Sequence, residues 1–221
     1  MNPLAARRFE AVIFDMDGLL LDSERPILEA WLRLAPQLRR EDYLLTVGRT
    51  RPDSQALLSE RLGSEAAALA LYAQVDVELT QRFGPGTAGF PLKPGALTLL
   101  QALRERGVPL AIASSTRHAK VLERLSLAGL IDFFGPIHGG DQVARGKPHP
   151  DLFELAAASL GIHPAKALVF EDSSYGAQGA LTAGAGVVLV PDLKAPDPVI
   201  APQCLLLDSL DAAQAHIPDW F

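Results

Sequence analysis

Six short apolar runs recur along the chain, and they constrain its fold more than any other feature of the sequence. In order, they are AVIF at 11–14, VPLAIA at 108–113, FGPIHG at 134–139, ALVF at 167–170, GVVLV at 186–190 and CLLL at 204–207. Runs without polar alternation are typical of strands that are covered on both faces, as the strands of parallel sheets are.

Helical patterns lie between most of these runs. Three of them fall at about 118–128, 150–160 and 174–183. A fourth begins near Pro94, carries Leu97, Leu100 and Leu103 on one face and stops at Gly107. Strands that alternate with helices predict an α/β fold with a doubly wound, Rossmann-like parallel sheet as its core.

The interval from residue 24 to about residue 84 breaks this alternation, because it contains no convincing strand and carries helical patterns throughout. One of its helices is predicted to begin after Ser64, which caps it, and to end at Gly84. The apolar stripe of this helix is predicted to be Leu69, Tyr72, Val75 or Asp76, Leu79 and Phe83.

The Gly/Pro-rich stretch FGPGTAGFPLKPG at 83–95 is typical of a linker that returns the chain to an interrupted core. We therefore expect two parts in the chain. An α/β core is predicted from residues 1–22 and 88–221, and an inserted helical cap subdomain from residues 23–87.

Charge and hydropathy limit the partners and the location. The chain has 26 acidic and 20 basic residues, a net charge of −6, and no basic run that would bind nucleic acid or a membrane surface. No stretch approaches the roughly 18 apolar residues of a membrane span. The single cysteine, Cys204, excludes an intramolecular disulfide and is compatible with a reducing compartment. We expect a cytoplasmic protein for which no obligate protein partner is evident.

Polar side chains follow the ends of four predicted strands. Asp15 and Asp17 follow the first, Ser114, Ser115 and Thr116 the second, Lys147 the third, and Glu171, Asp172, Ser173 and Ser174 the fourth. Ligands of open α/β sheets bind outside the carboxyl ends of the strands. We expect these side chains to converge on that edge of the sheet.

The chemistry of this set indicates phosphoryl transfer. Clustered carboxylates repel one another unless a hard cation neutralises them, and oxygen ligands suit Mg²⁺. An ammonium and hydroxyl groups suit the oxygens of a phosphate. A carboxylate beside both can attack phosphorus and form an aspartyl phosphate, while a second acid protonates the leaving oxygen.

Each motif alone has a simpler interpretation. Two acids near a glycine are common in turns, Lys147 alone could be a solvated lysine, and Ser114 could cap the helix that begins near residue 116. The EDSSYG stretch could be a capped turn between a strand and a helix. Four motifs in order, each at the end of a strand, favour the catalytic interpretation.

Together, the motifs resemble those of the haloacid dehalogenase-like phosphohydrolases. The matching stretches are DMDG at 15–18, IASST with Ser114, GKPHPDLF with Lys147, and VFEDSSYGAQGALTAG with Glu171 and Asp172. The resemblance covers essentially the whole chain. It includes the inserted helical cap, as in the branch that contains β-phosphoglucomutase and phosphoglycolate phosphatase.

The resemblance implies a role for each matching residue. Asp15 would be the nucleophile and Asp17 the general acid and base. Mg²⁺ would be bound by the Asp15 carboxylate, the backbone carbonyl of Asp17 and the Asp172 carboxylate, with Glu171 contributing directly or through water. The phosphoryl oxygens would be held by Ser114, Ser115 and Lys147.

The cap is predicted to supply specificity through the loop VGRTRPDS at 47–54. In similar enzymes a loop at this place reaches into the site, which makes Gly48, Arg49, Thr50 and Arg51 candidate substrate-specificity residues. Arg51 matches the position at which the sugar-phosphate mutases carry an arginine for a second phosphate. The alternative is that Arg51 is a surface arginine.

One departure bears on the reaction. Mutases of this type carry a histidine ten residues after the second aspartate, and this chain has Ile27 there. The first hypothesis is therefore a Mg²⁺-dependent phosphatase that hydrolyses a small phosphorylated metabolite, such as a sugar phosphate, through an aspartyl-phosphate intermediate. The second is a β-phosphoglucomutase-like sugar-phosphate mutase, and the third is a non-catalytic binding module.

Overall fold

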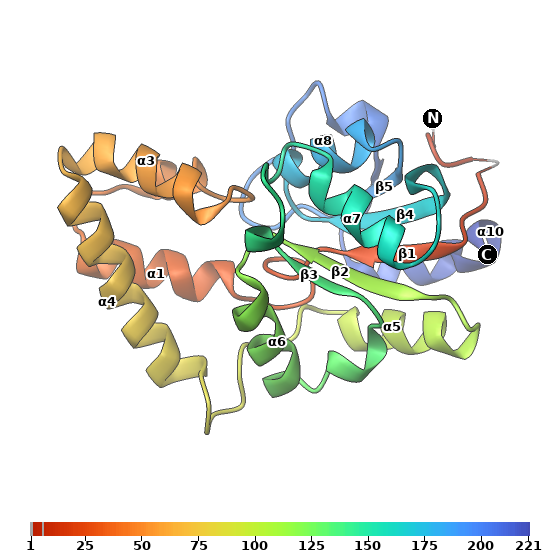
Figure 1. The fold of residues 1–221 in the computed structure, drawn as a ribbon, viewed down its shortest axis with the longest axis horizontal. Helices are drawn as coiled ribbons and strands as arrows, with labels where there is room; N and C mark the ends of the chain where they lie inside the picture. Colours follow the sequence, from red (N-terminus) through yellow and green to blue (C-terminus); the bar gives the residue numbers. More distant parts are fainter. Residues whose placement is uncertain (1, 6) are drawn as a thin grey trace.

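A six-stranded, entirely parallel sheet forms the centre of the molecule in the computed structural model, which describes residues 2–5 and 7–221 (Figure 1). The strands are β1 (Ala11–Phe14), β2 (Leu110–Ser114), β3 (Ile137–Gly139), β4 (Ala167–Glu171), β5 (Gly186–Leu189) and β6 (Leu205–Leu206). Their order across the sheet is β3-β2-β1-β4-β5-β6. The predicted α/β, doubly wound fold class is confirmed.

Helices cover both faces of this sheet, which explains why its strands lack polar alternation. One face carries α5 (Ala96–Glu105), α6 (His118–Leu127), α9 (Leu210–Ala213) and α10 (Ile217–Trp220), and the other carries α7 (Asp151–Ser159) and α8 (Ser174–Thr182). Side chains alternate between the two faces along β1. Val12 and Phe14 lie in the first core cluster and Ile13 in the second, and all three are fully buried.

Four helices lie between β1 and α5 and stand beside the sheet (Figure 1). They are α1 (Glu24–Leu34), α2 (Arg40–Leu44), α3 (Arg51–Leu62) and α4 (Glu65–Phe83). We call this segment the helical insert. Its centre is aromatic, because the Trp31 ring packs edge-on against Tyr43 and Tyr72, with centroids 5.0 and 5.5 Å apart.

The chain crosses between the core and the helical insert twice, and the two crossings pair with each other. Leu21 forms an antiparallel bridge with Leu92, and the Lys93 amide donates to the Leu20 carbonyl at 2.9 Å. The Asp192 carboxylate, 1% exposed, accepts from Lys93 at 2.6 Å and from Arg25 at 2.8 Å. Both crossings are thus held to the core by ion pairs with Asp192, in the loop that follows β5. The domain boundaries given above remain a prediction.

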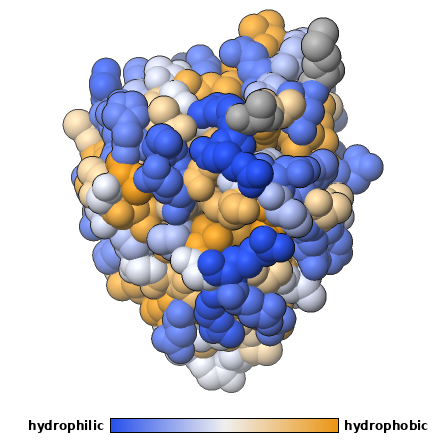
Figure 2. Space-filling view, turned by 90° about the vertical axis from the view of Figure 1, so that its right-hand side faces the viewer, coloured by the Kyte–Doolittle hydropathy of each residue, from blue (hydrophilic) through white to orange (hydrophobic). Residues whose placement is uncertain are grey.

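Short 3₁₀ turns fill several connections, at Ile131–Phe133, Gly140–Gln142, Pro164–Lys166, Ala201–Gln203 and Gln214–His216. The strand predicted at 134–139 is shorter than expected: β3 begins at Ile137, and Phe134 is a buried residue that precedes it. Figure 2 shows the end of the molecule away from the helical insert, where hydrophilic and hydrophobic residues are mixed over the surface.

Two predicted apolar stripes are wrong at their start. Leu97 is 40% exposed, and Leu99 is fully buried instead. Leu69 is 49% exposed, and α4 buries Ala68, Leu71, Val75 and Leu79. No helix in the described ranges is long and apolar enough to span a bilayer.

Candidate active site

The strand order reverses at β1, and this places the first acidic motif at the crevice where open α/β sheets bind ligands. Asp15 follows the last residue of β1 directly. Beyond the carboxyl ends of the strands lies a cavity of about 1630 Å³, lined by residues of both the core and the helical insert. Every predicted site residue except Glu171 lines it.

Lys147 joins two of the predicted acids. Its Nζ lies 2.5 Å from Asp15 Oδ1 and 2.5 Å from Glu171 Oε1, and its side chain is 1% exposed. Burial works to lower the pKa of Lys147, but the two carboxylates hold it above its usual value. The Lys147–Pro148 peptide bond is cis. Because of these two carboxylates, the Lys147 ammonium stays charged beside Asp15.

Glu171 contacts Lys147 and is not among the residues that line the cavity. Its Oε2 accepts from the Ser173 amide at 3.1 Å and from the Ser173 hydroxyl at 2.9 Å, so that both carboxylate oxygens are engaged. Gly176, in the first turn of α8, leaves room for this carboxylate, because a Cβ there would overlap it.

The acids of the site outnumber the cation that pairs with them. Burial raises the pKa of Asp15 to about 8 against the lowering effect of Lys147. Burial and the charges of Glu171 and Asp15 raise the pKa of Asp172 well above its usual value. Gly18, at φ 81°, allows Asp172 to approach the turn after β1, since a Cβ there would overlap the Asp172 carboxylate. Lys147 alone therefore does not supply enough positive charge to keep every carboxyl group of the site ionised.

This donor set fits Mg²⁺. Within the described residues the Asp172 carboxylate accepts no hydrogen bond, and that of Asp15 accepts only from Lys147. In the same residues no three Asp, Glu, His or Cys side chains are arranged to hold a metal by themselves. Mg²⁺ does not require such a cage, because one or two carboxylates with water and phosphate oxygens are its usual ligands.

The hydroxyl groups after β2 lie at the same edge. Ser114 is 1% exposed and its Oγ accepts from the Thr116 amide at 3.1 Å, while Ser115 Oγ donates to the Gly48 carbonyl at 3.3 Å. α6 begins at His118, as the helical pattern at about 118–128 predicted, and its N-cap is Arg117, so Ser114 does not cap it. The local Ser114 bond is therefore a turn contact, with the side chain on the cavity wall.

Asp17 has partners that the sequence motifs did not indicate. Its Oδ1 accepts from Ser23 Oγ at 2.7 Å and from Arg124 Nη1 at 2.5 Å, and its Oδ2 accepts from Thr116 Oγ1 at 2.8 Å. Arg124 comes from α6 and lies over the Phe90 ring at 5.0 Å. Nothing in the order of motifs links residue 124 to residue 17, so only the packing of α6 against the turn after β1 reveals this contact.

The predicted specificity loop contacts the core at several points. Arg49 stacks on the Tyr175 ring at 4.3 Å and donates to its hydroxyl. Thr50 is the residue before α3, and its Oγ1 donates to the Asp53 carboxylate at 2.6 Å. Gly48, at φ 80°, packs against Ser173, where a Cβ would overlap the Ser173 side chain. The loop thus closes one wall of the cavity.

Arg51 is engaged within the helical insert. Its Nη1 lies 2.7 Å from Asp76 Oδ2, and its guanidinium lies over the Tyr72 ring at 4.4 Å. It lines the cavity in this arrangement.

Glu24, the first residue of α1, also lines the cavity and was missed by the sequence analysis. Its Oε2 accepts from the Tyr43 hydroxyl at 2.5 Å. Burial, with the charges of Asp17 and Asp192, raises the pKa of Glu24 to about 7 despite the lowering effect of Tyr43. A glutamate seven residues after Asp17 carried no signal, because its partner comes from α2.

Comparison with known proteins agrees with this geometry. The model of the haloacid dehalogenase-like hydrolases matches residues 9–184. A phosphorylated carbohydrates phosphatase of Thermotoga maritima is 34% identical, over 79% of this chain and 82% of its own. A phosphoglycolate phosphatase of Rhodobacter capsulatus is 31% identical, over 81% and 83%. A haloacid dehalogenase family hydrolase of Deinococcus radiodurans, solved with bound phosphate and sodium, is 30% identical with a TM-score of 0.70, covering 94% and 95%.

Proposed function

The chain belongs to the haloacid dehalogenase-like hydrolase family and is a phosphoric monoester hydrolase, and we propose that it is a Mg²⁺-dependent phosphatase of small phosphorylated metabolites. The reaction would proceed through an aspartyl phosphate on Asp15. The contact of the Lys147 ammonium with Asp15, at 2.5 Å on the rim of the cavity, carries this proposal. It holds a cation where a carboxylate nucleophile and a phosphoryl group would meet.

In the first half of the reaction, an Asp15 carboxylate oxygen attacks phosphorus while the bond from phosphorus to the leaving oxygen breaks. Asp17 donates a proton to that oxygen, and the alcohol departs. In the second half, Asp17 takes a proton from water, and the water oxygen attacks phosphorus and displaces Asp15. Inorganic phosphate leaves, and both aspartates return to their starting state.

The surrounding groups hold the phosphoryl oxygens. Lys147 donates to them and offsets their charge, and Ser114 and Ser115 donate from the end of β2. We propose that Asp15, the backbone carbonyl of Asp17 and Asp172 hold Mg²⁺, with Glu171 acting through water because Lys147 and Ser173 occupy its oxygens. When bound, Mg²⁺ supplies charge stabilisation for the phosphoryl oxygens.

Gly48, Arg49, Thr50 and Arg51 remain the proposed specificity loop. A mutase reaction has less support, because Ile27 lies in the cavity at the position of the mutase histidine and Arg51 is already paired with Asp76. A non-catalytic binding module has least support, because the proposed nucleophile, acid and lysine are all present. We also propose a cytoplasmic location, with which the single, buried Cys204 is compatible.

Phosphate release from a panel of about a hundred phosphorylated metabolites, with Mg²⁺ and with EDTA, tests the proposal. We expect Mg²⁺-dependent release from several members and loss of more than about a thousandfold in kcat for Asp15→Asn, since no nucleophile of equal strength remains. Release that persists in Asp15→Asn would contradict the assignment of the nucleophile. Isomerisation of a sugar phosphate without net phosphate release would favour the mutase.

A further inference from the structure

We propose that Glu24 and Tyr43 bind a hydroxyl group of the substrate, and that the part of the substrate facing the helical insert carries hydroxyl groups and no second anionic group. This inference rests on the proposed phosphatase function and narrows its substrate class to monophosphates of uncharged polyhydroxylated compounds.

The Glu24–Tyr43 pair has a free acceptor in the cavity. Tyr43 is 3% exposed, and its hydroxyl donates to Glu24 Oε2 at 2.5 Å, which fixes the carboxylate in one orientation. No described residue donates a hydrogen bond to the other oxygen, Oε1. Because Glu24 lines the cavity, Oε1 is available to a ligand hydroxyl.

A buried donor lies on the same wall. Trp31 lines the cavity at 2% exposure, and its Nε1–H has no hydrogen-bond partner in the described part of the chain. Its ring packs edge-on against Tyr43, with centroids 5.0 Å apart. Buried indole N–H groups usually find a partner. The acceptor at Glu24 suits a hydroxyl group, which can donate to it, and the Trp31 N–H adds a donor, unpartnered among the described residues, in the packing next to Tyr43.

The charges that line the cavity differ between its two sides. On the side of the helical insert they are four acids and two arginines: Glu24, Asp53, Glu65 and Asp76, with Arg49 and Arg51. On the core side they are four acids and five bases: Asp15, Asp17, Asp141 and Asp172, with Arg117, Lys120, Arg124, Arg145 and Lys147. A metal bound at the core acids adds further positive charge there.

Both arginines on the insert side are already engaged. Arg51 pairs with Asp76 at 2.7 Å, and Arg49 stacks on Tyr175. The wall is net acidic, with four acids against two arginines, so like charge disfavours a phosphate or carboxylate placed against it. The phosphate to be cleaved is drawn to the core side, and an uncharged group fits the insert side.

Similarity alone does not select the leaving group. One relative of comparable identity is named for phosphorylated carbohydrates and another for phosphoglycolate, whose leaving group carries a carboxylate. The subsite formed by Glu24, Tyr43 and Trp31 favours the first kind of leaving group in this chain.

Two substrates of matched length test the charge argument. Glucitol 6-phosphate and 6-phosphogluconate have the same carbon chain but end in a hydroxymethyl group and a carboxylate, respectively. We expect kcat/KM to be at least about tenfold higher for glucitol 6-phosphate, because the carboxylate faces the acidic wall. Equal values, or a preference for 6-phosphogluconate, would overturn the proposal.

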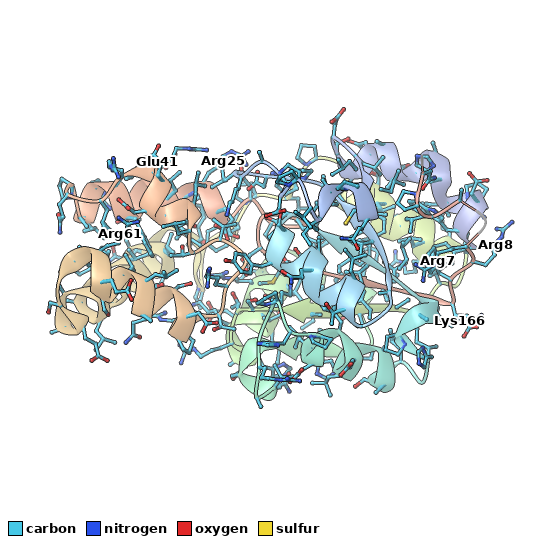
Figure 3. All side chains as sticks on the ribbon, turned by 90° about the horizontal axis from the view of Figure 1, so that it is seen from above. Arg7, Arg8, Arg25, Glu41, Arg61 and Lys166 are labelled. Atoms are coloured by element: carbon cyan, nitrogen blue, oxygen red, sulfur yellow. The ribbon has the colours of Figure 1, made fainter. Side chains whose placement is uncertain are left out.

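Substitution of Glu24 tests the subsite itself. For Glu24→Gln we expect KM for glucitol 6-phosphate to rise about tenfold or more, with kcat changed less than about threefold, as for the loss of one hydrogen bond to a charged group. With p-nitrophenyl phosphate, whose leaving group has no further hydroxyl, KM should rise less than about twofold. Glu41→Gln, at an exposed acid on the surface of the helical insert (Figure 3), is the matched control and should change neither substrate.

An equal rise in KM for both substrates would overturn the proposed subsite, because it would indicate a general effect of the substitution on the site. If Glu24→Gln fails to fold, Tyr43→Phe should show the same split between the two substrates. Absence of turnover with every phosphate ester would instead count against the proposed function. In that case, the subsite is tested by calorimetric binding of glucitol 6-phosphate to Asp15→Asn. Adding Glu24→Gln to this variant should weaken the binding about tenfold, and unchanged binding would overturn the proposal.

Discussion

Arg124 Nη1 lies 2.5 Å from Asp17 Oδ1, so a guanidinium from α6 holds the proposed general acid and base. The pair is largely enclosed, with 11% of the Arg124 side chain and 13% of the Asp17 side chain exposed. Ser23 and Thr116 donate to the same carboxylate. The orientation of Asp17 toward the cavity is therefore set by three side chains from three segments.

Arg124→Gln should lower kcat for phosphate release by about 10- to 100-fold, the equivalent of one charge-assisted hydrogen bond, with little change in KM. Arg124→Lys should restore part of the rate, because an ammonium can donate to the same oxygen. Steady-state kinetics on a common phosphate ester measures both. A kcat for Arg124→Gln within twofold of the parent value would show that Ser23 and Thr116 suffice to orient Asp17.

Lys147→Met should lower the free energy of unfolding by about 3–5 kcal/mol in EDTA, because it leaves the Asp15 and Glu171 carboxylates buried without their cation. Added Mg²⁺ should recover more stability in this variant than in the parent. Urea unfolding measures both values. The control is Lys166→Met, an exposed lysine at the far end of the core (Figure 3) that pairs with Glu10 at 3.3 Å and should change stability by less than about 1 kcal/mol.

Gly176→Ala should destabilise the protein by about 1–3 kcal/mol, because the new methyl group would overlap the Glu171 carboxylate. This sign is informative, since alanine in place of glycine within a helix ordinarily stabilises by about 1 kcal/mol. Gly135→Ala is a control for the added methyl group alone, because Gly135 lies in a bend outside the helices and the nearest atom to a Cβ there is 3.9 Å away. Thermal unfolding of the two variants should differ in direction or size, and equal effects would contradict the steric argument.

Glu24→Gln should raise the melting temperature in EDTA at pH 8 more than at pH 5. The pKa of Glu24 is raised from 4.5 to about 7 in the folded protein, so folding favours the protonated carboxyl group. Its contribution is fully present below pH 4.5 and is lost as the pH rises through about 7. Glutamine cannot ionise and removes this loss. If the difference in melting temperature between Glu24→Gln and the parent does not grow between pH 5 and pH 8, the raised pKa of Glu24 is contradicted.

The strands were predictable because burial on both faces leaves a direct mark in the sequence, as at Val12, Ile13 and Phe14. The buried faces of the helices were harder to predict than the strands. Around Leu97 and Leu99 several apolar residues fit a helical period, and only contact with the sheet decides which of them is buried. Leu69 is exposed for the same reason, since small Ala68 meets the neighbouring helix instead.

The residues of the site also divide into those that the sequence could predict and those that it could not. Sheet topology brings together five residues that lie at or after the ends of strands, which the order of the motifs can indicate: Asp15, Asp17, Ser114, Lys147 and Asp172. Glu24 and Arg124 act through partners on other helices. Their sequence positions have no fixed relation to Tyr43 or Asp17, and the packing of the helices had to be known first.

The Leu21–Leu92 bridge gives the helical insert a modular character. Because the chain leaves the core and re-enters it at adjacent points, a different set of helices could be grafted there without opening the sheet. The groups that would cleave the phosphate ester belong to the core, whereas Glu24, Tyr43 and the 48–51 loop belong to the exchangeable part. Evolution can therefore replace the selectivity of such a catalyst as a unit while its hydrolytic chemistry stays intact.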